Sequence, residues 1–175
     1  HAAQLASKIA TRDVLPLLQR QVEKVVGEDA FRAQSNKYSL LYSHVWLHPW
    51  LPIIGVQRMR PLFGPLCNCI TRWFKHVWDP LSETNNSSTN QQPSQPRGID
   101  IVLPWSELFR RTEMETLLEN GVMPALDDVI SGLNLSVSAA NAKEMQAFVR
   151  DHVIEMWKDV MGEDYVAALV SARFL

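Results

Sequence analysis

The sequence predicts an all-α protein in which kinked helical hairpins stack as degenerate repeats. Three observations lead to this fold class. Apolar residues recur at helical spacing along most of the chain, prolines lie inside several of the helical patterns, and a Pro-Trp motif occurs twice. A strand-like pattern appears in only one short run, Ile99 to Leu103. Since 175 residues suit one hydrophobic core, we expect residues 1–175 to form a single domain.

The N-terminal half contains two clear helical patterns. The first is an apolar stripe that begins at Val14 and ends at Val25, and it includes Leu15, Leu18 and Val22. The second runs from Pro61, which suits a first helical position, to Val77, and Asp79-Pro80 ends it. Its apolar stripe consists of Leu62, Phe63, Leu66, Ile70, Trp73, Phe74 and Val77. Both segments are predicted to be helices that bury one face.

The C-terminal half contains three more predicted helices. Thr112 and Glu115 have the spacing of a capping box, which favours a helix start there. Asn141, with Glu144 three residues later, is a second candidate start, and Gly162 is predicted to end that helix. A last short helix is expected from Tyr165.

Prolines and tryptophans mark a possible internal repeat. Pro16, Pro61, Pro65 and Pro124 lie inside helical patterns, where each removes a backbone hydrogen bond and bends the helix. Two Pro-Trp motifs, His48-Pro49-Trp50 and Leu103-Pro104-Trp105, accompany these kinked segments. The combination predicts a degenerate helical repeat of about fifty residues.

One segment differs from the rest in composition. Residues 82–98 are rich in Ser, Asn, Gln and Pro and contain no large apolar residue. Such a segment buries too little surface to offset its ordering entropy. We therefore expect a mobile insertion at 82–98 between two packed halves.

Composition excludes several classes of protein. The 17 Lys and Arg are balanced by 19 Asp and Glu, for a net charge of −2, which disfavours a polyanion-binding domain. No apolar run approaches the roughly 18 residues of a membrane span. Cys67 and Cys69 are spaced too closely for a zinc site or a disulfide framework, and no phosphate-binding loop or nucleophile elbow is present. We predict no metal, no cofactor and no enzymatic activity.

The six tryptophans are the candidate functional residues. We interpret them first as core anchors between helices, and alternatively as hot spots of an interface. They are Trp46, Trp50, Trp73, Trp78, Trp105 and Trp157. A second hypothesis, a helical RNA-binding module, rests on a modest basic neighbourhood of Arg58, Arg60, Arg72, Lys75 and His76.

Several motifs together resemble a known family. They are His48-Pro49-Trp50-Leu51-Pro52, Arg60-Pro61-Leu62-Phe63 with Pro65, Trp78-Asp79-Pro80, Leu103-Pro104-Trp105 with Glu107-Leu108-Phe109, Asn120-Gly121-Val122-Met123-Pro124-Ala125-Leu126, and Met145-Gln146-Ala147-Phe148. From about Val14 to the C-terminus the chain resembles the GC-rich-sequence-DNA-binding-factor-like (GCFC) domain. Within that group it is most similar to the tuftelin-interacting protein family of G-patch splicing factors. The chain is thereby expected to be a piece of a longer protein, and the insertion is longer than the connection usual in the family.

The resemblance implies a nuclear protein of pre-mRNA splicing. Members of the family help to disassemble the intron-lariat spliceosome by recruiting and stimulating a DEAH-box ATPase. That stimulation belongs to a G-patch, which is not visible in this sequence. The resemblance therefore implies a non-catalytic docking scaffold for spliceosomal proteins, with a second GCFC-domain protein and the DEAH-box helicase as candidate partners, and RNA contact as a secondary feature.

Overall fold

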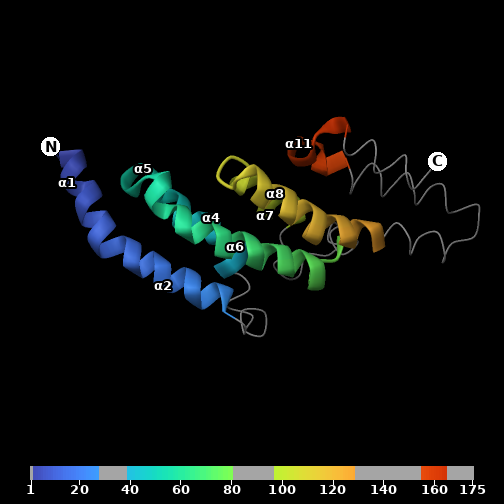
Figure 1. The fold of residues 1–175 in the computed structure, drawn as a ribbon, viewed down its shortest axis with the longest axis horizontal. Coiled ribbons are helices and arrows are strands. Elements are labelled where there is room, and N and C mark those ends of the chain that lie inside the picture. The colour runs from blue at the N-terminus through green and yellow to red at the C-terminus, as the bar shows by residue number, and fades with distance from the viewer. Residues whose placement is uncertain (1, 28–38, 81–96, 129–154, 165–175) are drawn as a thin grey trace, which may run out of the picture.

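The computed structural model describes residues 2–27, 39–80, 97–128 and 155–164. Within these ranges the chain is helical and contains no β-strand, which confirms the predicted all-α class (Figure 1). None of the helices in the described ranges is both long and apolar enough to cross a membrane.

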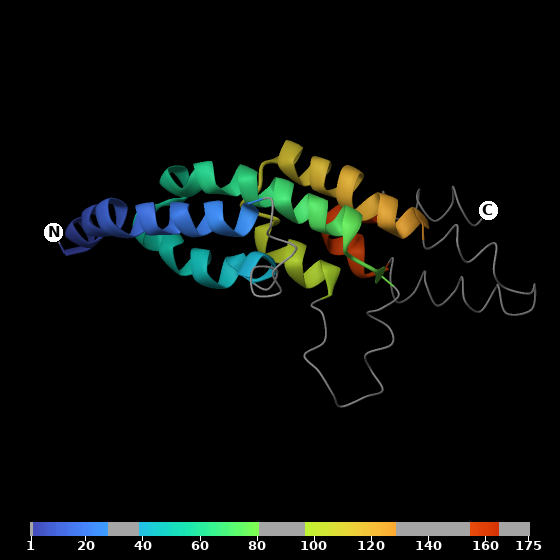
Figure 2. The ribbon, with the colours of Figure 1, turned by 90° about the horizontal axis from the view of Figure 1, so that it is seen from below.

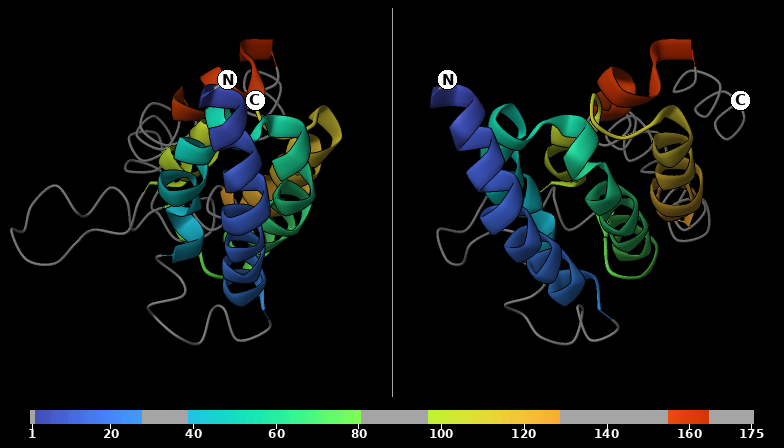
Figure 3. Two further views of the ribbon diagram at one scale, coloured as in Figure 1. Left: turned by 90° about the vertical axis from the view of Figure 1, so that its left-hand side faces the viewer. Right: turned by 60° about the vertical axis from the view of Figure 1, so that its left-hand side comes forward.

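Three long helices lie side by side and run in the same direction (Figures 1 and 3). The first consists of α1 (Ala2–Ile9), a π-helical turn (Ala10–Val14) and α2 (Leu15–Val26). The second is α6 (Val56–His76). The third consists of α8 (Arg111–Leu117), a π-helical turn (Leu118–Val122) and a helical continuation over residues 123–128. Because α6 packs against both α2 and α8, it is the central helix of the row.

Shorter helices form a second layer, on one side of the long ones (Figure 2). The first group is α4 (Ser43–Leu47), a 3₁₀ turn (His48–Trp50) and α5 (Leu51–Ile54). The second is α7 (Gly98–Val102) with a 3₁₀ turn (Leu103–Trp105). A third group lies near the C-terminal end and consists of a 3₁₀ turn (Glu155–Trp157) and α11 (Lys158–Met161).

Each of the two π-helical turns directly precedes a proline-containing segment. The N–H of Leu15 donates to the carbonyl of Ala10, and the N–H of Met123 donates to that of Leu118, so each bond spans five residues. Pro16 and Pro124 follow immediately. Because proline has no N–H and its ring crowds the preceding turn, a wider turn allows the helix to continue past it. The helix thus passes Pro16 and Pro124 through π turns, whereas α6 contains Pro61 and Pro65 without one.

The 3₁₀ turns end in Trp50, Trp105 and Trp157, which lie about fifty residues apart. The first and third turns are each followed by a four-residue helix and a glycine with positive φ, Gly55 (φ 94°) and Gly162 (φ 86°). This likeness is local. A complete repeat of stacked hairpins stays a prediction.

The start of α6 differs from the prediction. The helix begins at Val56, so Pro61 lies inside it and is not its first residue. Gly55 breaks the chain before Val56, because its φ of 94° lies in the left-handed region that favours glycine. Pro61 and Pro65 are tolerated inside the helix because both lie on its exposed face, where water reaches the carbonyls that lose a donor.

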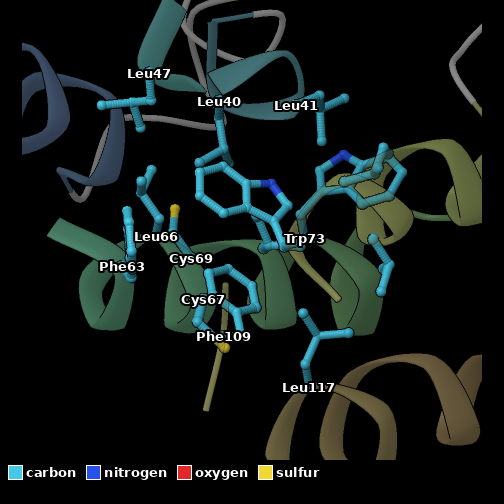
Figure 4. Close-up of a cluster of buried hydrophobic side chains, with 14 of the residues drawn as sticks. Leu40, Leu41, Leu47, Phe63, Leu66, Cys67, Cys69, Trp73, Phe109 and Leu117 are labelled. Atoms are coloured by element: carbon cyan, nitrogen blue, oxygen red, sulfur yellow. The ribbon is translucent and has the colours of Figure 1, made fainter. Parts of the chain in front are cut away.

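The core surrounds α6. Figure 4 shows its side chains between Leu40, Leu41 and Leu47 on one side and Phe109 and Leu117 on the other. The predicted apolar stripe of α6 is buried except for Val77, which is partly exposed. The predicted first stripe is also confirmed, since Leu18, Val22 and Val25 are buried.

The structure around residue 98 is helical. The strand-like run Ile99 to Leu103 lies in α7 and its 3₁₀ turn. Gly98, the last residue of the predicted insertion, is buried and begins α7. A Cβ atom at Gly98 would lie only 2.8 Å from Cζ2 of Trp78, so the glycine allows α7 to approach the end of α6. Residues 82–96 lie outside the described ranges.

The predicted boundaries in the C-terminal half have mixed outcomes. The capping box uses different residues, because α8 begins at Arg111 and the side chain of Glu113 accepts from the N–H of Arg110 at 2.7 Å. Gly162 ends α11, as predicted. The predicted helix start at Asn141 and the helix from Tyr165 lie outside the described residues.

Candidate functional site

The tryptophans divide into two groups by burial. Trp73, Trp78, Trp105 and Trp157 are buried, whereas Trp46 and Trp50 are half-buried. Burial gives the first group contacts within the core and leaves it little surface for a partner. Only Trp46 and Trp50 retain part of their side chains at the surface.

The buried tryptophans join the ends of different elements. Trp78, just after α6, has its ring 4.9 Å from Phe74 and 5.7 Å from Trp157, and Trp157 lies 5.9 Å from Phe74. These edge-to-face contacts hold the C-terminal 3₁₀ turn against α6. Sequence reasoning missed this third Trp-ending turn, because Glu155-Met156-Trp157 contains no proline.

A second aromatic cluster surrounds Trp105. Its ring lies 5.0 Å from His48, 5.8 Å from Phe63 and 5.0 Å from Phe109, with which it stacks. The cluster therefore joins the two Pro-Trp turns to α6. Trp46 is fixed separately, since its Nε1 donates to the carbonyl of Ser39 at 3.1 Å.

Two histidines, His44 in α4 and His48 in the following 3₁₀ turn, lie close together. The rings of His44 and His48 are 5.8 Å apart. Burial lowers the pKa of both, and the nearby His44 lowers that of His48 further. Neither His44 Nδ1 nor His48 Nε2 has a hydrogen-bond partner. No third ligand is close, because the described residues contain no group of three or more His, Cys, Asp or Glu side chains that fits a metal ion.

The two cysteines point to opposite neighbours of α6. Cys67 Sγ lies 3.3 Å from the carbonyl of Glu113 in α8, and Cys69 Sγ lies 3.9 Å from that of Val25 in α2. Burial raises the pKa of the Cys67 thiol to about 11 and also raises that of Cys69. Both thiols are therefore protonated at neutral pH and are poor nucleophiles.

Most of the basic neighbourhood contacts the protein itself. Arg60 donates to the carbonyl of Leu108, pairs with Glu113 at 2.7 Å and lies over the ring of Phe63. Arg58 reaches Ser7 Oγ and the carbonyl of Ile54, each at 3.3 Å.

Arg72, the third arginine of this group, donates to the carbonyl of Val26 at 3.3 Å. These arginines link α6 to α1, α2 and α8, and Arg60 is the one that is also partly buried, whereas Arg58 and Arg72 remain exposed. Lys75 and His76 remain exposed at the end of α6.

Among the described residues, nine large apolar side chains are exposed: three lie on the first long helix and four others lie between Tyr42 and Val56. Leu5, Ile9 and Leu17 are 60%, 47% and 59% exposed. The sequence analysis did not identify this face, because its first stripe began at Val14. The i, i+4 spacing of Leu5 and Ile9 is the signal that indicates it.

Sequence comparisons relate this chain to known proteins. The family model for GC-rich sequence DNA-binding factor-like protein matches residues 3–175. Tuftelin-interacting protein 11 of Xenopus laevis is 26% identical over 133 residues, which cover 75% of this chain and 13% of that protein. The protein of the same name from Gallus gallus is 24% identical over 131 residues, with the same coverage of 75% and 13%.

The chain thus spans about 13% of the length of the curated relatives that it matches. No solved structure matches it significantly. Because the family model covers nearly all of the sequence, the chain belongs to the GC-rich sequence DNA-binding factor-like (GCFC) family.

Proposed function

We propose that this chain is a non-catalytic protein-interaction scaffold of a pre-mRNA splicing factor. The observation that carries the proposal is the likeness of 75% of the chain to Tuftelin-interacting protein 11, together with membership of the GCFC family. The whole factor acts, in this proposal, in disassembly of the intron-lariat spliceosome with a DEAH-box ATPase. The G-patch that would stimulate the ATPase lies outside this chain, which supplies docking surfaces in the nucleus.

The chemistry of the described residues supports a scaffold. The pKa values of His44, His48, Cys67 and Cys69 are shifted mainly by burial. Burial favours the uncharged form of each group but does not supply an acid or base that could exchange a proton with it. The proposed partners are spliceosomal proteins, with a second GCFC-domain protein as one candidate and the DEAH-box helicase as another.

The structure gives less support to the alternative, a helical RNA-binding module. RNA binding by the basic neighbourhood would require cationic groups free to contact phosphates. Arg60 is instead paired with Glu113, whereas Arg58 donates to Ser7 Oγ and remains exposed. RNA contact is therefore kept as a secondary feature of the proposal.

Affinity purification tests this function. The tagged chain is incubated with nuclear extract, with and without nuclease, and the recovered proteins are identified by mass spectrometry. A matched bait carrying Trp73→Ala and Trp105→Ala, which removes two buried anchors, controls for binding to unfolded protein. We expect late-spliceosome proteins, including a DEAH-box ATPase, on the wild-type bait only and in both nuclease conditions.

The other outcomes assign the function differently. Loss of every splicing protein after nuclease treatment would favour the RNA-binding alternative, particularly if binding weakened steeply with salt. Recovery of no splicing protein in either condition would overturn the proposed function.

A further inference from the structure

The first long helix has one packed side and one bare side. Ala10, Leu18, Val22 and Val25 are buried against the rest of the protein, and Arg58 links Ser7 to the end of α5. By contrast, α1 contains no buried residue although its sequence is amphipathic. Its apolar side chains therefore remain outside the core.

The π turn aligns the exposed apolar residues. In an uninterrupted α-helix, Leu17 would be rotated by about 80° from Ile9. The π turn at Ala10–Val14 adds one residue to the turn and reduces this rotation. Leu5, Ile9 and Leu17 consequently form one stripe along the outer face, which we call the outer stripe.

A row of positive charge runs beside the outer stripe. Lys8, Arg12 and Arg20 are all exposed. Arg12 is paired with Asp13 at 2.7 Å, whereas neither Lys8 nor Arg20 has an ion-pair partner within the described ranges. At the N-terminal end of the stripe, Ala2, Gln4, Leu5 and Lys8 line a cavity of about 350 Å³. The face thus combines apolar side chains, unneutralised cations and a hollow large enough for a side chain.

We propose that the outer stripe docks an acidic amphipathic segment of a partner protein, with its apolar residues on Leu5, Ile9 and Leu17 and its carboxylates beside Lys8 and Arg20. Charge complementarity selects this occupant, because a second copy of the chain would bring the same cations together. The inference rests on the proposed function, since it names the chemistry of a partner that the scaffold would hold.

Fluorescence anisotropy with designed peptides tests the inference. The probe is a labelled helical peptide with a leucine stripe flanked by glutamates, and a second probe replaces the glutamates with lysines. We expect the wild-type chain to bind the acidic probe at least about tenfold more tightly than the basic one. Its affinity should also fall as salt rises.

Variants locate the binding face. The pair Leu5→Ser and Leu17→Ser, and the pair Lys8→Glu and Arg20→Glu, should each weaken binding at least about tenfold. Because all four side chains are exposed, circular dichroism should show unchanged folding. Leu103→Ser and Lys75→Glu are matched controls on other elements, with Leu103 47% exposed, and should leave binding unchanged.

Three results would overturn the inference: equal affinity for the two probes, equal weakening by the control variants, or concentration-dependent self-association that the Leu5 and Leu17 changes abolish. The last result would assign the face to a second copy. If the wild-type chain recovers splicing proteins but does not prefer the acidic probe, only the docking inference fails. If it prefers the acidic probe but recovers no splicing protein, only the proposed function fails.

Discussion

Helices α1 and α6 have opposite relations to the core. Helix α1 is amphipathic, contains no proline and buries none of its residues. Helix α6 contains two prolines and carries several arginines, yet nine of its residues are buried. Apolar content and helix propensity therefore do not explain the difference in burial.

The number of packed neighbours explains it. Helix α6 packs between α2 and α8 and also contacts α5, whereas α1 continues into α2 and contacts α5 on one side. A central helix buries side chains of several faces, while a helix at the end of a row leaves one face uncovered. Four predictions test how strongly the position of a residue in the row determines the stability that is lost when the residue is replaced.

The largest contrast should be between a central tryptophan and an outer leucine. Trp105 is fully buried and Leu5 is 60% exposed. We expect Trp105→Ala to lower the free energy of unfolding by about 3–5 kcal/mol, and Leu5→Ala to change it by less than about 0.5 kcal/mol. Urea unfolding followed by circular dichroism measures both. Similar losses for the two variants would show that α1 packs as tightly as the centre.

Two carboxylates of α8 provide the next contrast. Glu113 accepts from Arg60 and from the N–H of Arg110, and its side chain is 23% exposed. Glu113→Ala should cost about 1–3 kcal/mol, because Arg60 loses a charged partner in a partly buried site. Glu115→Ala is the matched control, since its partner Arg111 is 91% exposed, and should cost less than about 0.5 kcal/mol. Equal costs in urea unfolding would contradict this view of the α6–α8 contact.

Replacing Gly98 and Gly64 by alanine should change the stability of the protein in opposite directions. A Cβ at Gly98 would lie 2.8–2.9 Å from ring atoms of Trp78 and Phe74, so Gly98→Ala should destabilise the protein by about 1–3 kcal/mol. A Cβ at Gly64, inside α6, meets only Glu113 Oε1 at 3.8 Å. Gly64→Ala should stabilise by up to about 1 kcal/mol, because alanine favours the helix. Thermal unfolding of both variants reveals the signs, and stabilisation by Gly98→Ala would disprove the close packing of α7.

The smallest effect should be a loss of stability in mild acid. Burial lowers the pKa of His44 and His48 in the folded protein, so the unfolded chain takes up protons first as pH falls. Stability is therefore present above the ordinary histidine pKa of about 6.5 and is lost as pH decreases through and below it. Urea unfolding at a series of pH values from about 7.5 to 5.5 measures the decrease.

Replacing both histidines isolates their share of this pH dependence. A chain with His44→Gln and His48→Gln should show a flatter profile than the wild-type chain, whereas His76→Gln, at an exposed position, should leave the profile unchanged. An unaltered slope in the double variant would mean that other groups cause the acid sensitivity.

Long apolar stripes were the part of the fold that could be predicted well. Leu18, Val22 and Val25, and the stripe from Leu62 to Phe74, are buried as their spacing predicted, because repeated helical periodicity over several turns is a strong signal. The short run Ile99 to Leu103 had a strand-like pattern in a chain predicted to be all-α, so its own pattern did not indicate the helix. Its β-branched residues are buried in a helix, and a few apolar residues in succession have no period that separates strand from helix.

The candidate site was harder to predict than the fold. Its tryptophans were visible in the sequence, but their division into buried Trp105 and half-buried Trp50 was not. The basic neighbourhood also had to be reinterpreted, because Arg60 contacts Glu113, which lies far from it in sequence. The composition gives the number of charged residues. Their contacts within the fold determine which of these residues can bind another molecule.

The sequence by itself determined the all-α class, the family and the two long buried apolar stripes, because local periodicity and motif order are properties of the chain. The tertiary structure alone decided which faces are covered. Helix α6 is enclosed by neighbours and α1 is not, since burial depends on packing between segments distant in sequence. The same packing brought Arg58 and Arg60 into contact with Ser7 and Glu113 and left Leu5, Ile9 and Leu17 exposed on the same helix as Lys8 and Arg20.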